Sequence, residues 1–264
     1  RVGREQHPRA AAVEAVDRRR ALEAVHRAMQ DGRIRTESAL EGCERVAILG
    51  EDHGGLPGPS HQPPDAVVYP QSTDDVQEIV RICGMLHKKN YLAATDGNVS
   101  VRLGDRVLIT PSGVHKGYME ADQVITVDLR GQVLEGEGRP TSEIRMHLLA
   151  YELRPDIAAV VHAHLPYATA CTLAGIDLLE PILPEVVITL GGIPTAPYAT
   201  PGSEEVPEAI RDFIQGYDAI LLSRHGAMTV GRDVMDAYNK MEKLEHTARV
   251  VLAARLQGPL EPLP

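Results

Sequence analysis

The sequence carries little positive charge for its length of 264 residues. Its 27 lysines and arginines are outnumbered by 37 aspartates and glutamates, and the formal net charge is −10 at pH 7. Binding to a phosphate backbone needs a basic footprint, so a nucleic-acid partner is not expected. The sequence also lacks the ~20-residue apolar run of a membrane helix and a charged-then-apolar signal segment at its start. We therefore expect a soluble, cytoplasmic protein that binds neither nucleic acid nor membrane.

Cysteine is scarce as well. The three cysteines, Cys43, Cys83 and Cys171, show no C-x-x-C spacing. An odd number of scattered cysteines does not suit a disulfide framework. We expect these residues to be reduced and mostly structural.

The first part of the chain differs in composition from the rest. Residues 9–48 are rich in alanine, arginine and glutamate, with apolar residues at roughly helical intervals, and residues 51–72 are rich in proline and glycine. These patterns predict a helical arm and an extended connector over residues 1–72, followed by one compact domain over residues 73–258. With 43% hydrophobic residues, the chain can bury a core of that size.

The pattern after residue 72 mixes helices with short strands, which indicates an α/β fold. The segment 72–75, S-T-D-D, resembles a capping box and predicts a helix over 73–88. Further helices are predicted over 142–153 and 234–256. Strands are predicted at 99–103, 106–110, 124–128, 186–190 and 219–223, and one more strand carries a pair of histidines.

His162 and His164 lie one residue apart in the apolar run A-A-V-V-H-A-H. Side chains alternate faces along a strand, so both rings project to the same side and can converge on one ion. Zinc would satisfy both imidazoles, although such a pair taken alone is explained more simply by hydrogen bonds to buried carbonyl groups. His225 adds a third imidazole in the turn after the apolar residues 220–223. Three ligands with an open position are the pattern of a catalytic zinc site.

Three short motifs suit an anion such as phosphate. In P-T-S-E, residues 140–143, Thr141 or Ser142 can cap a helix whose free amides face the anion. Glu143 lies in the same first turn, where glutamate is also common without any function. Two turns of small residues, D-G-N-V-S at 96–100 and T-P-S-G at 110–113, let backbone amides approach closely, although each is an ordinary turn on its own. His147, one turn further along, is interpreted as a packing or neighbouring residue rather than as a ligand.

Six motifs follow one another between about residues 75 and 256: G-N-V-S-V-R, I-T-P-S-G, P-T-S-E-I-R-M-H, R-P-D-I-A-A-V-V-H-A-H, A-P-Y-A-T-P-G and H-G-A-M-T-V-G. Their order resembles that of the class II aldolase/adducin family, in particular its fuculose-phosphate-aldolase-like branch. The resemblance implies a three-layer α/β fold with a central, mainly antiparallel sheet flanked by helices. It also implies a homotetramer with active sites between subunits.

The resemblance assigns a role to each matching residue. One zinc ion per subunit is assigned to His162, His164 and His225, and the acid/base role is assigned to Glu143. The substrate phosphate is assigned to the small and polar residues of the three motifs, namely Gly97, Asn98, Ser112, Gly113, Thr141 and Ser142.

These residues imply a zinc-dependent aldolase that cleaves a ketose 1-phosphate, such as a fuculose or deoxyribulose phosphate. The products would be dihydroxyacetone phosphate and a short aldehyde. Zinc would stabilise the enediolate that forms as the C3–C4 bond breaks, and Glu143 would carry its proton.

The sequence departs from the family pattern at one position that bears on the identity of the aldehyde product. Fuculose-phosphate aldolases place a proton-donating tyrosine after the first histidine strand, whereas residues 183–192 read L-P-E-V-V-I-T-L-G-G. A pentulose-phosphate 4-epimerase, a decarboxylase of the same family, a zinc hydrolase and a non-catalytic, adducin-like interaction module are the alternatives.

A second, weaker resemblance lies at residues 63–83, P-P-D-A-V-V-Y-P-Q-S-T-D-D-V-Q-E-I-V-R-I-C. It is similar to the opening of an FAD-linked oxidase domain. The glycine-rich continuation that would bind the cofactor pyrophosphate is missing, so no flavin is predicted.

Overall fold

The computed structural model describes residues 73–263. The arm and connector predicted over residues 1–72 lie outside them, and so does Ser72 of the predicted capping box. The first described element is α2 (Thr73–Lys88), which has the bounds predicted from the sequence. No helix in residues 73–263 is long and apolar enough to cross a membrane.

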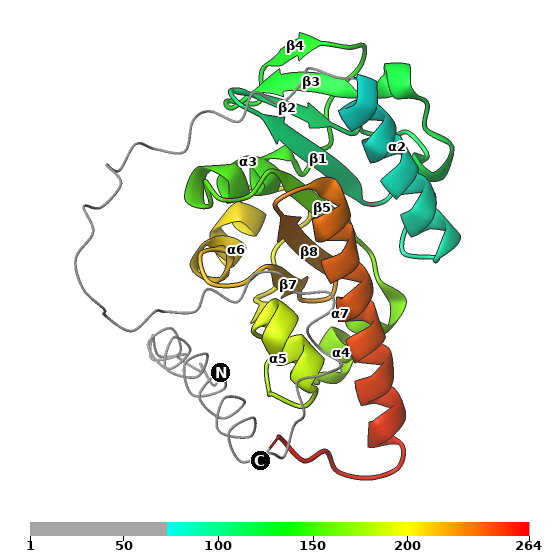
Figure 1. The fold of residues 1–264 in the computed structure, drawn as a ribbon, viewed down its shortest axis with the longest axis vertical. Helices are drawn as coiled ribbons and strands as arrows, with labels where there is room; N and C mark the ends of the chain where they lie inside the picture. The colour runs from blue at the N-terminus through cyan, green and yellow to red at the C-terminus, as the bar shows by residue number, and fades with distance from the viewer. Residues whose placement is uncertain (1–72, 264) are drawn as a thin grey trace, which may run out of the picture.

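The domain is built on one sheet of eight strands in the order β4-β3-β2-β1-β5-β8-β7-β6 (Figure 1). Its strands are β1 (Asn98–Leu103), β2 (Arg106–Ile109), β3 (Ile125–Asp128), β4 (Val133–Glu135), β5 (Ala159–Ala163), β6 (Thr195–Ala196), β7 (Ala219–Leu222) and β8 (Gly226–Gly231). Neighbouring strands run antiparallel except β6 and β7, which are parallel. The predicted α/β fold with a mainly antiparallel sheet is confirmed.

Helices cover both faces of the sheet and give the domain three layers (Figure 1). The other helices are α3 (Ile144–Leu153), α4 (Pro166–Ala174), α5 (Pro184–Leu190), α6 (Glu205–Ile214) and α7 (Val234–Arg255), with short 3-10 helices η2 (Lys116–Tyr118) and η3 (Ala121–Gln123). Alternation along β5 divides the core: Val161 packs in a cluster with residues of α2, α4, α5 and α7, whereas Val160 packs in a cluster with residues of α3 and α6.

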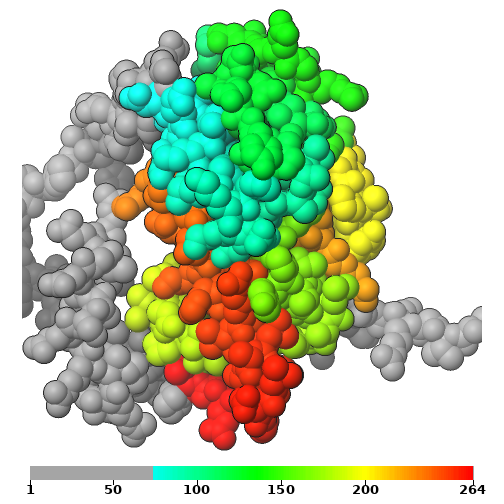
Figure 2. Space-filling model, turned by 90° about the vertical axis from the view of Figure 1, so that its right-hand side faces the viewer, coloured from blue at the N-terminus to red at the C-terminus, as the bar shows by residue number. Residues whose placement is uncertain are grey.

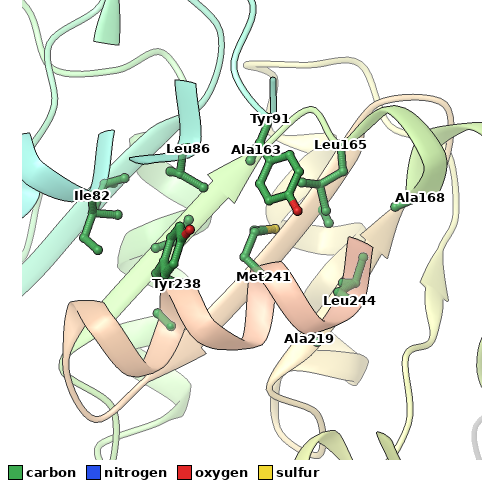
Figure 3. Packing of buried hydrophobic residues seen from close by; sticks show 14 of the residues in the cluster. Ile82, Leu86, Tyr91, Ala163, Leu165, Ala168, Ala219, Tyr238, Met241 and Leu244 are labelled. Atoms are coloured by element: carbon green, nitrogen blue, oxygen red, sulfur yellow. The ribbon is translucent and has the colours of Figure 1, made fainter. Parts of the chain in front are cut away.

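One side of helix α7 is buried along its length in the first of these clusters. Tyr238, Met241 and Leu244 recur every three residues, so they share one side of the helix. They point toward the sheet, and Tyr238 lies next to Ile82 and Leu86 of α2 (Figure 3). From outside, α2 (cyan) lies near one end of the molecule and the last turns of α7 (red) lie near the other (Figure 2). This packing supports, from the α7 face of the sheet, the strands next to the three histidines.

The predicted strand over residues 186–190 is wrong, because these residues belong to α5. Pro184 stands in the first turn of this helix, and Gly191 ends it in a left-handed conformation with φ of 72°. Between them, Val186 and Leu190 are buried four residues apart, on one side of the helix. The β-branched run V-V-I-T favours a strand only where a sheet is available to pack it.

The helix predicted over 142–153 begins two residues later, at Ile144. The hydroxyl of Thr141, one of the two predicted caps, accepts the N–H of Glu143 at 3.3 Å, and its carbonyl oxygen accepts the N–H of Ile144 at 3.2 Å. Glu143 therefore stands immediately before the helix and not in its first turn, and its side chain makes no capping hydrogen bond.

Candidate metal centre

Three neighbouring strand ends bring the histidines together. His162 lies near the end of β5, where it is opposite Asn98 of β1, and His164 follows that strand. His225 precedes β8, which pairs with β5. The ring centroids are 5.0 Å apart for His162 and His164, 4.8 Å for His162 and His225, and 4.7 Å for His164 and His225. The convergence predicted from the sequence is thus present.

Glu143 joins this cluster from the segment before α3. Its Oε2 lies 3.1 Å from Nε2 of His162, and its Oε1 lies 3.5 Å from Nε2 of His225. With His164 included, the four side chains each offer one ligand atom, and these atoms all lie within 4.8 Å of one another. The sequence predicted three ligands with a nearby acid/base; the structure places the carboxylate among the ligand atoms.

The donor set fits a divalent cation. The Nδ1 of His162 lies 2.9 Å from the carbonyl oxygen of Ala227, which can only accept, so Nδ1 carries the hydrogen in the neutral ring. Its Nε2 then presents a lone pair to the carboxylate of Glu143 and to Nε2 of His164, 3.1 Å away. Glu143 Oε1 is buried and has no hydrogen-bond partner among residues 73–263. A cation between these groups would satisfy all of them, and imidazole and carboxylate ligands suit zinc.

The same contacts shift the pKa values of Glu143 and His225 when no metal ion is bound. Burial by itself would raise the pKa of Glu143, but the charge and hydrogen bond of His162, the charge of His225 and the amide of Asn98 outweigh it and hold the pKa well below its ordinary value. Burial, together with the charge of His162, lowers the pKa of His225 to about 4. The carboxylate is therefore ionised and His225 is neutral near pH 7, as ligands require.

A buried polar network holds the carboxylate in place. Asn98 donates from Nδ2 to Glu143 Oε2 and to Thr141 Oγ1, both at 3.0 Å, and its Oδ1 accepts a hydrogen bond from Nε2 of His147. The Nδ1 of His147 lies 2.7 Å from the hydroxyl of Ser100. Burial, followed by the charge of His162, lowers the pKa of His147 to about 3, so this ring is neutral.

The contacts of His147 agree with its interpretation as a residue next to the ligands. The use of the Asn98 side chain to position Glu143 was not foreseen from the sequence. The alternation of polar Asn98 and Ser100 along β1 is the signal that could have indicated it, because both face the helix that follows Glu143.

Two of the three motifs predicted to bind phosphate, residues 110–113 and 140–143, lie side by side. An isolated β-bridge joins Pro111 and Pro140, and the N–H of Ser112 donates to the carbonyl oxygen of Arg139 at 2.9 Å. This pairing sets the exposed Ser112 beside Arg139, and it sets Thr110 beside Thr141, the residue before the exposed Ser142. Gly113 has a φ of 74°, which favours glycine, and a Cβ there would meet open space.

Two of the predicted phosphate ligands have other constraints. Gly97 has a φ of 69°, and a Cβ on it would lie 2.8 Å from the carbonyl oxygen of His162, so close packing alone requires glycine. Both amide hydrogens of Asn98 are already donated within the protein. The phosphate roles of Gly97, Asn98 and the four residues of the other two motifs stay predictions.

Residues 77–252 match the class II aldolase and adducin N-terminal domain family. The chain belongs to this family. Residues 77–83, which also fall in the oxidase-like stretch, are part of this match and lie in α2. The comparisons give no support to an FAD-linked oxidase segment.

Several characterised or solved proteins are similar to the chain. It is 36% identical to an L-fuculose phosphate aldolase of Methanococcus maripaludis over 177 residues, which are 67% of this chain and 95% of that protein. It is 33% identical to a 3-oxo-tetronate 4-phosphate decarboxylase of Pectobacterium atrosepticum over 179 residues, 66% of this chain and 82% of that protein. The structure of an L-fuculose-1-phosphate aldolase from Thermus thermophilus aligns with a TM-score of 0.63 at 30% identity, covering 70% of this chain and 98% of the other.

Proposed function

We propose that the protein is a zinc-dependent lyase that acts on a small sugar phosphate, cleaving a ketose 1-phosphate to dihydroxyacetone phosphate and a short aldehyde. The observation that carries this proposal is the cluster of three imidazoles and one carboxylate with ligand atoms within 4.8 Å of one another. Zinc bound by His162, His164 and His225 would polarise the substrate carbonyl and stabilise the negative charge that develops on its oxygen. We also propose that the protein is cytoplasmic and, as the family resemblance implies, that it works as a homotetramer.

Glu143 is the group that carries the proton. Its carboxylate is ionised and held by Asn98, so it can take a proton from the C3 carbon in the condensation direction or return one in cleavage after protonation. In this mechanism the carboxylate leaves the cluster to reach the substrate, because the same oxygen atoms face the histidines at 3.1 and 3.5 Å. The exposed residues Ser112, Gly113 and Ser142 would hold the phosphate, which fixes the carbonyl relative to Glu143.

Decarboxylation of a 3-oxo-tetronate 4-phosphate is the second candidate. Loss of carbon dioxide from such a compound leaves the same enediolate that cleavage of a ketose 1-phosphate produces, and protonation then gives dihydroxyacetone phosphate. Aldol cleavage also needs a base for the C4 hydroxyl proton, whereas loss of carbon dioxide from a carboxylate does not. The helix α5 and its flanks, residues 183–192, contain no tyrosine for this task. That absence, with the similarity to a decarboxylase, favours this alternative.

The co-product distinguishes the two reactions, since both release dihydroxyacetone phosphate. The zinc-loaded protein should be incubated with fuculose 1-phosphate, deoxyribulose 1-phosphate and a 3-oxo-tetronate 4-phosphate. Aldehyde and carbon dioxide are then measured separately, beside dihydroxyacetone phosphate. Release of aldehyde supports the aldolase, and release of carbon dioxide alone supports the decarboxylase. If no substrate reacts, and His225→Ala retains as much metal as the wild type, the proposed lyase site is wrong.

A further inference from the structure

His164 faces a hydrogen-bond acceptor on each side of its ring. On one side, Nδ1 lies 3.2 Å from Oδ2 of Asp96. On the other side, Nε2 lies 3.1 Å from Nε2 of His162. A neutral imidazole carries only one ring hydrogen, so His164 can donate to one of these acceptors and must present a lone pair to the other.

A neutral His162, the form that binds a metal ion, cannot resolve this competition by donating itself. Its own hydrogen is on Nδ1, which donates to the carbonyl oxygen of Ala227 at 2.9 Å. Its Nε2 then has only a lone pair to present to His164. If His164 answered with a hydrogen on Nε2, that nitrogen would be blocked and could not bind a metal ion, because a ligand nitrogen must be unprotonated.

We propose that Asp96 is a positioning residue that holds His164 in the tautomer with its hydrogen on Nδ1, so that Nε2 stays free as a ligand. A carboxylate is a stronger acceptor than a neutral imidazole, because a charge-assisted hydrogen bond is roughly twice as strong as a neutral one. The inference rests on the proposed metal site, and it adds a residue that acts on that site through His164.

The loop around Asp96 is fixed well enough for this role. The N–H of Asp96 donates to the carbonyl oxygen of Ala93 at 2.9 Å. The neighbouring carbonyl oxygen of Thr95 accepts a hydrogen bond at 3.1 Å from the ammonium group of Lys116, a residue that is only 2% exposed. On the other side, Gly97 packs against the backbone of His162. The Asp96 side chain itself is 45% exposed, so its replacement leaves the core intact.

The tautomer can be read without metal or substrate. Long-range proton–nitrogen NMR of the metal-free protein, at a pH high enough that the ring nitrogens of His162 report a neutral imidazole, shows which nitrogen of His164 carries the hydrogen. The His164 signals are assigned by their loss in His164→Gln. We expect hydrogen on Nδ1 in the wild type and in the control Asp105→Ala, which changes an exposed aspartate in the β1–β2 turn. We expect a shift toward hydrogen on Nε2 in Asp96→Ala.

Metal affinity, measured by competition with a chromophoric chelator, gives the second readout. Asp96→Ala should bind zinc about 10- to 100-fold more weakly than the wild type, the usual effect of removing a carboxylate that orients a ligand histidine. Asp96→Asn keeps an acceptor oxygen but loses the charge, so it should retain the Nδ1 tautomer in part and bind zinc with an affinity between those of the wild type and Asp96→Ala. Asp105→Ala should match the wild type in both measurements.

The outcomes separate this inference from the proposed function. If Asp96→Ala keeps both the wild-type tautomer and the wild-type zinc affinity, the inference is overturned and the proposed function is unaffected. If the wild type binds no zinc but its His164 tautomer still depends on Asp96, the proposed metal site fails and the tautomer assignment stands. An Asp96→Asn variant as weak as Asp96→Ala would assign the effect to loop structure and also overturn the inference.

Discussion

Replacing Asn98 by alanine tests whether the buried network positions Glu143. Asn98 is 2% exposed, and its side chain makes hydrogen bonds to Glu143, Thr141 and His147. The bond to the carboxylate is charge-assisted and contributes about 1.5–3 kcal/mol, and the bond to the hydroxyl about 0.5–1.5 kcal/mol. The variant also leaves a buried ring N–H of His147 without its acceptor. We expect a loss of about 3–5 kcal/mol in the free energy of unfolding, a large share of the ~5–15 kcal/mol of a typical domain.

Urea unfolding of the metal-free protein, followed by circular dichroism, measures this loss. The matched control is Asn239→Ala, because Asn239 is exposed on α7 and its side chain makes no hydrogen bond within residues 73–263; it should change the free energy by less than about 0.5 kcal/mol. Glu143 should also be less well held in Asn98→Ala, so zinc affinity should fall together with stability. If Asn98→Ala is no less stable than Asn239→Ala, the network does not contribute as its geometry indicates, and the reasoning is refuted.

Three further changes test other parts of the structure. Glu143→Gln should lower turnover roughly 10²-fold or more because it removes the proton carrier; near-normal steady-state turnover would point to another group. Glu245→Ala should cost about 2–4 kcal/mol in urea unfolding, because this buried carboxylate accepts two N–H groups at the start of α4. The exposed ion pair of Glu242 should be worth at most about 1 kcal/mol, so an equal loss in Glu242→Ala would contradict the burial argument. Deletion of residues 1–70 should leave a folded domain with an unchanged number of subunits, measured by size-exclusion chromatography with light scattering; a smaller oligomer would place the arm in an interface.

Helices and strands with a strong local pattern could be predicted from the sequence. The helix α2 has the predicted bounds, and α7 ends one residue before the predicted end. The strand β8 was missed, because Gly226 and Gly231 in H-G-A-M-T-V-G look like turn signals. In the fold, a Cβ on Gly226 would lie 2.4 Å from the carbonyl oxygen of Ala163. Glycine is needed there for the close approach of β5 and β8, a contact between distant segments that no local pattern contains.

The same distinction between local and long-range information applies to the candidate site. The spacing of His162 and His164 is local, and it indicated that both rings share one side. The contact between Glu143 and two of the imidazoles depends on where α3 packs relative to β5, and the direction of the Asn98 side chain depends on its register opposite His162 in β5. The order of the sequence motifs indicated that these residues belong to one site. Only the fold shows that Asn98 turns its amide to Glu143, while the resemblance assigned it to the phosphate.

The similarity of one chain to both an aldolase and a decarboxylase has a chemical explanation. Cleavage of a ketose 1-phosphate and decarboxylation of a 3-oxo acid phosphate both leave a carbanion next to a carbonyl group, and both need the same stabilisation of charge and the same delivery of a proton. In the proposed mechanism, the imidazole cluster and Glu143 would serve these shared steps. The reactions differ only in the departing fragment, which lies beyond the C3 carbon of the ketose. Residues that contact this fragment therefore decide between the two activities, and the absence of tyrosine from residues 183–192 bears on that decision more than any feature of the metal cluster.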